Sequence, residues 1–146
     1  MKVEKMVRII QIAIGINFLW FGMLKMFPGM SPAESLAIMT IEKLTFGLIA
    51  PHISIKLLAI WEVLIGVGFI IGMYPKFFVR IFMLHMILTF TPLFLFPKLC
   101  FTVVPLGLTI VGQYIIKNLV FIAAGVLICN TLVKNNTCAP CSRGEL

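Results

Sequence analysis

Four apolar tracts, each about twenty residues long, constrain this chain more than any other feature. They cover residues 7–27, 53–73, 77–96 and 110–132, and proline interrupts the chain between each tract and the next. A helix rises about 1.5 Å per residue, so twenty residues make a helix of about 30 Å, the thickness of the hydrocarbon layer of a bilayer. We therefore expect four membrane-spanning helices.

The overall composition leads to the same expectation. Hydrophobic residues make up 61% of the chain and charged residues 12%, with no aspartate, whereas roughly a quarter of an ordinary soluble domain is charged. A small globule has too little interior to hide so much apolar surface. The sequence predicts an all-α integral membrane protein, with a single four-helix bundle domain over residues 1–134 and a polar tail over residues 135–146.

The basic residues indicate an orientation for this bundle. The net charge is +7, and many of the basic residues flank the tracts: Lys2, Lys5, Arg8, Lys76, Arg80, Lys134 and Arg143. Binding of nucleic acid needs a clustered basic face, which this distribution does not provide. Cytoplasmic flanks of membrane helices are rich in Lys and Arg, so we expect an inner-membrane protein with both termini in the cytoplasm.

Two connecting segments carry further structure. Ser31 followed by Pro32 and Glu34 matches a helix start in which Ser31 is the N-cap and Glu34 closes a capping box. The helix so predicted, from Pro32 to Leu48, mixes apolar with charged residues and is expected either to lie on the outer face as an amphipathic helix or to pack against the bundle there. The breakers Pro105 and Gly107 predict a short irregular or re-entrant piece before the fourth span.

Ionisable and amide side chains occur within the apolar tracts, where each charge costs about 3 kcal/mol or more. Measured along the helices, four of them fall at a similar depth in antiparallel spans: Asn17, Glu62, His85 and Lys117, the last followed by Asn118. We expect these groups to form one polar layer near the middle of the membrane.

Two interpretations of this layer remain open. Glu62 is either a structural partner of Lys117 that fixes the helix register, or a carboxylate that carries protons or binds a ligand. Lys25 lies within about one turn of the outer boundary. Its ammonium either reaches the headgroups along the helix, or turns inward beside Glu42 and forms a charged rim.

His85 and the aromatic residues have similar pairs of interpretations. His85 is either neutral and bonded to a backbone carbonyl, or a proton relay and quinone hydrogen-bond donor. Trp61, with Trp20 and the phenylalanines, either lines the pocket of a flat aromatic ligand or makes ordinary packing and lipid contacts. No second imidazole shares the layer, so we predict no metal site there.

Glycine and proline in the spans predict local packing. Gly15 and Gly22 in the first tract, and Gly66, Gly68 and Gly72 in the second, favour close helix packing. Pro92 frees a backbone carbonyl within the third tract, and neighbouring polar groups must satisfy it. Thr89 and Thr91 are the candidates for this role.

The polar tail contains Cys138 and Cys141 in a C-x-x-C motif, and Cys129 lies near the inner end of the fourth span. On the expected topology all three thiols face the reducing cytoplasm, which argues against a permanent disulfide. The alternatives are a redox pair, a metal clip that would need further ligands, and an inert tail. Cys100, on the outer side, is expected to be a buried thiol.

Four short motifs together resemble the DoxX-like superfamily of small four-helix membrane proteins. They are Gly22-Met23-Leu24-Lys25, Glu62 followed by Gly66, Thr91-Pro92, and Gln113-Tyr114-Ile115-Ile116-Lys117-Asn118. The last two also resemble the RclC/YkgB branch. The resemblance covers residues 8–132 and implies a membrane redox role, because the superfamily includes the small subunit of a thiosulfate:quinone oxidoreductase.

Three functions follow as hypotheses. In the first, the protein is a quinone-linked redox subunit of thiosulfate or thiol:quinone type in which Glu62 and His85 handle protons, Lys117 and Asn17 contact the ligand with Trp61, and Lys25 forms the rim. This sequence carries no soluble sulfur-handling domain, so such an enzyme would need a partner protein. The second is a small-solute carrier or channel, which would need a homo-oligomer. The third is a membrane assembly or chaperone-like factor without catalysis.

Overall fold

The computed structural model describes residues 3–31, 33–72 and 75–137, and regular structure in this part is mostly helical. Four helical segments are long and apolar enough to cross a membrane: Val3–Leu24, Pro51–Ile71, Pro75–Leu95 and Ile110–Val133. The prediction of four span-length helices is therefore confirmed. The largest shift from the expected bounds is at the first helix, which begins at Val3 instead of Val7.

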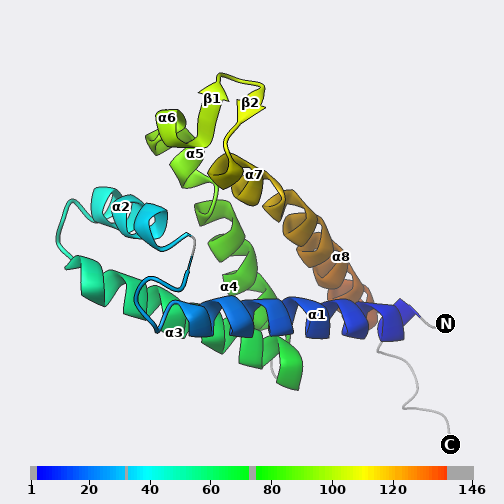
Figure 1. Ribbon diagram of the computed structural model, residues 1–146. Helices are drawn as coiled ribbons and strands as arrows, with labels where there is room; N and C mark the ends of the chain where they lie inside the picture. Colours follow the sequence, from blue (N-terminus) through cyan, green and yellow to red (C-terminus); the bar gives the residue numbers. More distant parts are fainter. Residues whose placement is uncertain (1–2, 32, 73–74, 138–146) are drawn as a thin grey trace, which may run out of the picture.

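The most extensive helix contact joins α1 (Val3–Leu24) and α3 (Pro51–Ile71), which lie antiparallel and side by side (Figure 1). A Cβ atom on Gly66 would lie 2.6 Å from the backbone nitrogen of Leu19, and one on Gly22 would lie 2.9 Å from that of Val63. Both approaches are closer than any side chain allows, so glycine permits backbone-to-backbone packing here. The predicted close packing at Gly15, Gly22 and Gly66 is confirmed.

Arg8 ties the beginning of α1 to the end of α3. Its guanidinium donates hydrogen bonds to the carbonyl oxygens of Phe69, at 2.9 Å, and Ile70, at 2.5 Å. The helix ends at Ile71, and its C-cap residue Gly72 has a φ of 79°, in the left-handed region. The last carbonyls of a helix lack partners within it, so Arg8 serves as their side-chain cap. The sequence had indicated only a flanking cation at this position.

The second pair of helices is α4 (Pro75–Leu88) and α8 (Asn118–Thr137). These two contact each other, and each also contacts the α1–α3 pair. Figure 1 shows α4 and α8 inclined to the direction of α1 and α3. The main hydrophobic core lies where the four helices meet and consists of Val7, Ile14, Phe18, Ile65, Phe69, Val79, Phe82, Met86 and Ile128.

Short elements connect α4 with α8. After α4 come α5 (Thr91–Leu95) and α6 (Pro97–Cys100), an antiparallel hairpin of β1 (Phe101–Val103) and β2 (Gly107–Leu108), and α7 (Ile110–Ile116). The irregular piece expected before the fourth span is thus a small β-hairpin, so the all-α expectation was incomplete. Its turn contains Pro105, which cannot donate to a helical ladder, and β1 is rich in the β-branched and aromatic residues that favour strands.

The break between α4 and α5 follows from Pro92. Proline has no N–H, so the carbonyl of Leu88, four residues earlier, loses its helical donor. The Thr91 hydroxyl donates to this carbonyl at 2.7 Å, and the Thr89 hydroxyl donates to the carbonyl of Met86 at 2.6 Å. The prediction that these two threonines satisfy the interrupted backbone is confirmed.

The expected surface helix is α2 (Glu34–Leu44), which packs on α3 and α5. Its predicted capping box was wrong, since Ala33 occupies the N-cap position without a side-chain cap. Glu34 instead accepts a hydrogen bond from the backbone N–H of Gly29, at 2.8 Å, and Pro32 lies outside the described residues. The helix stops at Leu44, well before Leu48, because the chain turns through positive φ at Phe46 and Gly47.

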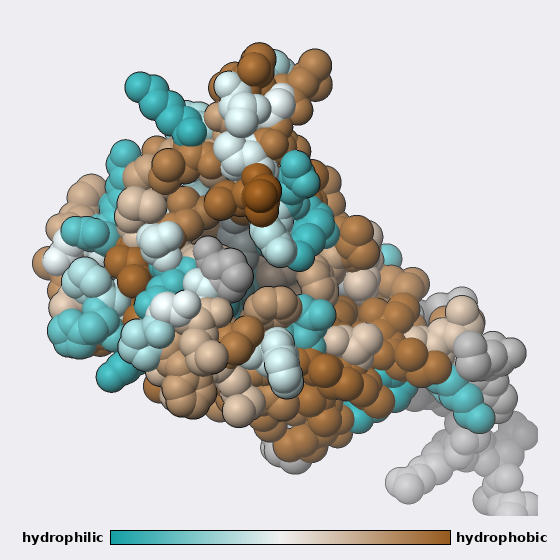
Figure 2. All heavy atoms as spheres, in the orientation of Figure 1, coloured by the Kyte–Doolittle hydropathy of each residue, from teal (hydrophilic) through white to brown (hydrophobic). Residues whose placement is uncertain are grey.

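The surface of the molecule is strongly apolar along the long helices. On the face of the molecule drawn in Figure 2, hydrophobic residues cover the part formed by α1, α3 and α8, and hydrophilic residues gather around α2. Trp20 on α1 is 66% exposed, and Val120 on α8 is 72% exposed. Exposed apolar surface on this scale marks contact with lipid or protein.

Candidate functional site

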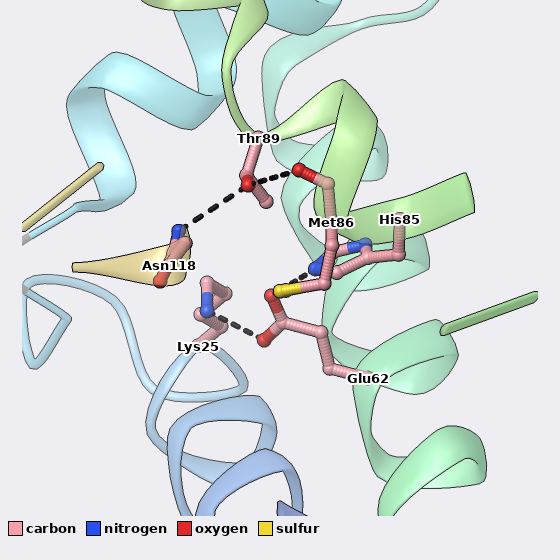
Figure 3. A network of polar contacts seen from close by, with 6 residues as sticks. All are labelled: Lys25, Glu62, His85, Met86, Thr89 and Asn118. Atoms are coloured by element: carbon pink, nitrogen blue, oxygen red, sulfur yellow. Dashed lines mark hydrogen bonds and ion pairs between the residues drawn. The ribbon is translucent and has the colours of Figure 1, made fainter. Parts of the chain in front are cut away.

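Three ionisable side chains meet inside the protein: Lys25, Glu62 and His85 (Figure 3). The ammonium of Lys25 donates to Oε2 of Glu62 at 2.5 Å, and Nε2 of His85 lies 3.5 Å from Oε1 of the same carboxylate. Each of the three residues is at most 8% exposed. One carboxylate therefore bridges a lysine and a histidine, and we call Lys25, Glu62 and His85 the polar centre.

The helix faces explain why these residues meet. Lys25 follows α1 directly and lies seven residues after Phe18 and three after Gly22, both of which are buried. Residues spaced by three, four or seven share one helix face, so the face that packs on α3 carries Lys25 with it. Glu62 lies likewise between the buried residues Ala59 and Ile65 of α3.

The polar centre lies deep along the span-length helices. Glu62 is eleven residues from the start of α3 and nine from its end, which corresponds to about 16 Å and 14 Å of helix. His85 is ten residues from each end of the segment Pro75–Leu95. Two helices thus bring ionisable groups together near the middle of their apolar length.

The buried charges of the polar centre compensate each other. A buried charge is tolerated where it is paired and hydrogen-bonded, and the Lys25–Glu62 pair meets both conditions. Lys25 also lies just beyond the last turn of α1, where the helix dipole favours a cation. Among the described residues no buried side-chain nitrogen or oxygen atom lacks a hydrogen-bond partner.

His85 joins the polar centre to the aromatic core. Its ring contacts Phe18 edge to face, with ring centroids 5.4 Å apart, and Phe18 contacts Phe82 in the same way at 5.3 Å. One side of the imidazole therefore faces a carboxylate, and another faces aromatic rings.

A second set of hydrogen bonds ties α8 to the same region. The side-chain amide of Asn118 donates to the Thr89 hydroxyl at 3.2 Å, and the backbone N–H of Thr89 donates to the carbonyl of His85 at 3.0 Å. Asn118 thereby holds the last turn of α4, which carries His85 (Figure 3). The sequence placed Asn118 near the polar layer but gave no partner for it.

The structure brings together only part of the predicted layer. Lys117 is exposed and lies over the ring of Tyr114, so the expected Glu62–Lys117 pair was wrong. Asn17 is also exposed, because it lies one residue, or about 100° of rotation, from the buried face at Phe18. Trp61, at 39% exposed, points away from the polar centre that its neighbour Glu62 enters.

Lys25 was the residue that the sequence misplaced most. Two positions were considered for its ammonium, one at the headgroups and one turned inward beside Glu42. The headgroup position is wrong, and the inward direction is confirmed, but the partner is Glu62 instead of Glu42, because the close α1–α3 contact at Gly22 places Lys25 within reach of Glu62. Its spacing from Gly22 and Phe18 was the signal that could have located it.

The two described cysteines, Cys100 and Cys129, are not part of the polar centre. Cys100 is fully buried in a small cluster with Leu36 and Ile115, as predicted, and burial raises the pKa of its thiol. Cys129 is exposed on α8. Cys138 and Cys141 lie outside the described residues. Within the described residues, no three His, Cys, Asp or Glu side chains come close enough to hold a metal ion.

Comparison of the chain with protein-family models, with curated proteins and with solved structures finds no match. The polar centre and the four apolar helices are therefore the observations from which a function can be argued.

Proposed function

We propose that this protein is a DoxX-like inner-membrane protein of four spans, arranged as a bundle with both termini in the cytoplasm. In this proposal it acts as the membrane subunit of a quinone-linked redox system of thiosulfate or thiol:quinone type, together with a partner protein. The observation that carries the proposal is the convergence of Lys25, Glu62 and His85 at mid-length of apolar helices. Ionisable groups in such positions are costly and commonly mark proton or ligand pathways.

The residues of the polar centre suit proton exchange with a quinone. Reduction of a quinone to a quinol takes up two electrons and two protons, and the electrons would come from the sulfur or thiol donor of the partner. His85 would donate a hydrogen bond to a quinone oxygen and pass a proton to it, and Glu62, after taking up a proton from the aqueous phase, would return one to His85 across the 3.5 Å contact. Two such cycles would deliver the two protons, and Lys25 would stabilise the ionised carboxylate between them.

Native mass spectrometry of the protein, extracted gently from its own membrane, tests this proposal. Wild-type protein is expected to retain a quinone, and Glu62→Gln is expected to lose it while its helical content stays unchanged. Lys56→Gln is the matched control, because Lys56 is an exposed lysine on the same helix. A Glu62→Gln protein that keeps a quinone, or a wild type with none, would contradict the quinone assignment.

One observation favours the alternative of an assembly or chaperone-like factor. The Lys25–Glu62 pair is fully satisfied within the chain, and such a pair can serve only to fix helix register. In that case Lys25→Met combined with Glu62→Gln removes both charges together and leaves partner binding intact. Loss of partner binding in a folded double variant would argue against this alternative.

A further inference from the structure

Lys117 is the only charged residue between Lys98 and Lys134, a stretch of 35 residues. It lies within the span-length segment Ile110–Val133, where a charge is costly. Lys25, at the end of the first span-length helix, is compensated by Glu62. Lys117 has no such carboxylate among the described residues.

The side chains around Lys117 form a surface that presents both polar and apolar groups to a ligand. Its ammonium lies 4.0 Å from the centre of the Tyr114 ring, a contact that orients the side chain along the helix. Ile110, Gln113, Tyr114 and Lys117 together line an open depression of about 420 Å³. This depression offers a cation, a phenol, an amide and an apolar wall.

The direction of the side chain sets the depth of the charge. Lys117 is seven residues below the start of this helical segment, or about 10 Å. Side chains on a helix lean toward its N-terminus, and contact with Tyr114, three residues earlier, agrees with that direction. The ammonium is thus about one turn from the helix start, within reach of a headgroup at the membrane boundary.

We propose that this depression binds the headgroup of an anionic phospholipid. The Lys117 ammonium pairs with the phosphodiester, the Tyr114 hydroxyl and the Gln113 amide donate hydrogen bonds to its oxygens, and Ile110 contacts the first part of an acyl chain. A net negative headgroup is favoured over a zwitterionic one because it leaves no second cation beside Lys117. This inference rests on the proposed membrane insertion but not on the quinone assignment.

The test uses the full chain in nanodiscs that contain phosphatidylglycerol and phosphatidylcholine in equal amounts. Lipids retained by the protein are counted by native mass spectrometry after release. One basic residue near a membrane surface contributes about a five-fold preference for anionic lipid. Lys117→Gln is therefore expected to lower the ratio of retained phosphatidylglycerol to phosphatidylcholine about five-fold relative to wild-type protein.

Lys56→Gln provides the matched control, because Lys56 is an exposed lysine within α3 and lies outside the depression. It should keep the wild-type preference, as should Lys117→Arg, which preserves the charge. An unchanged preference in Lys117→Gln, or an equal loss in Lys56→Gln, overturns the site. Competition by inorganic phosphate at millimolar concentration would overturn the assignment to lipid. Failure of the wild type to enter nanodiscs would overturn the proposed insertion itself.

Discussion

Replacing Lys25 with Met is the perturbation that most directly probes the polar centre. The substitution removes the ammonium but keeps a side chain of similar length, so Glu62 keeps only His85 as a polar partner. Glu62→Gln is the complementary change, and the double variant removes both charges. We expect Lys25→Met to be the more harmful single change, because Lys25 in Glu62→Gln lies beyond the helix end and can turn toward the headgroups.

The geometry gives the expected size of the effect. At the 2.5 Å separation of Nζ and Oε2, Coulomb's law with an effective dielectric constant of about 20 gives about 7 kcal/mol of gross attraction. Dehydration of the two ions offsets most of this, at several kcal/mol per ion. Removing one partner leaves the other buried and unpaired, so Lys25→Met should lower the free energy of unfolding by about 3–5 kcal/mol.

Unfolding by a denaturing detergent in mixed micelles, followed by circular dichroism, measures these changes. The double variant should lose less than the sum of the two single variants, because the interaction between them is already gone in each. Lys56→Met, an exposed lysine on α3, should change the free energy of unfolding by at most about 0.5 kcal/mol. Additive losses, or a Lys25→Met variant as stable as Lys56→Met, would refute the buried pair.

Three further changes probe the packing that positions this centre, and each is measured by the same unfolding assay. Gly66→Ala should destabilise by about 1–3 kcal/mol, because its Cβ would meet the backbone nitrogen of Leu19 at 2.6 Å. Arg8→Met should cost at least about 2 kcal/mol, because the charged hydrogen bonds to the last carbonyls of α3 are lost. Thr91→Val should cost about 1–2 kcal/mol, and less in a Pro92→Ala background, where the restored N–H can reach the same carbonyl.

Hydropathy predicts the helices of this chain well because lipid leaves few alternatives. A backbone in hydrocarbon must satisfy its own hydrogen bonds, so a long apolar tract is almost bound to be helical. The same logic predicted the roles of Thr89 and Thr91 next to Pro92. Glycine at positions 15, 22 and 66 predicted close helix packing, and these residues lie where α1 and α3 meet.

The partner of Glu62 was harder to predict because it depends on the direction in which a side chain points as well as on its depth along the helix. Counting residues along a helix gives the depth of a side chain, and by this count Lys117 lies at a depth similar to that of Glu62. Direction depends on which face packs, and an error of one residue turns a side chain by about 100°. Lys25 follows the spacing of the buried residues Phe18 and Gly22, whereas Lys117 lies two residues after the buried Ile115 and points outward.

The connecting segments deviate from prediction for local reasons. Ser31 and Glu34 have the spacing of a capping box, but Glu34 finds a better-placed donor in the N–H of Gly29. The hairpin between α6 and α7 depends on non-local bonds, such as that from the N–H of Thr109 to the carbonyl of Cys100 at 3.0 Å. A sequence pattern read along one segment does not reveal such bonds.

The interruptions of the helices and the polar centre belong to one continuous polar region. Backbone breaks at membrane depth persist only where polar groups satisfy them. At the α4–α5 break the hydroxyls of Thr89 and Thr91 meet this condition, and the Thr89 hydroxyl in turn accepts a hydrogen bond from Asn118, the first residue of α8. The same threonine is bonded to the carbonyl of His85. Any shift of α8 against α4 therefore acts on the turn that orients the imidazole. Because Lys117 precedes Asn118 directly, a lipid bound at Lys117 would touch the helix junction that holds His85 in place.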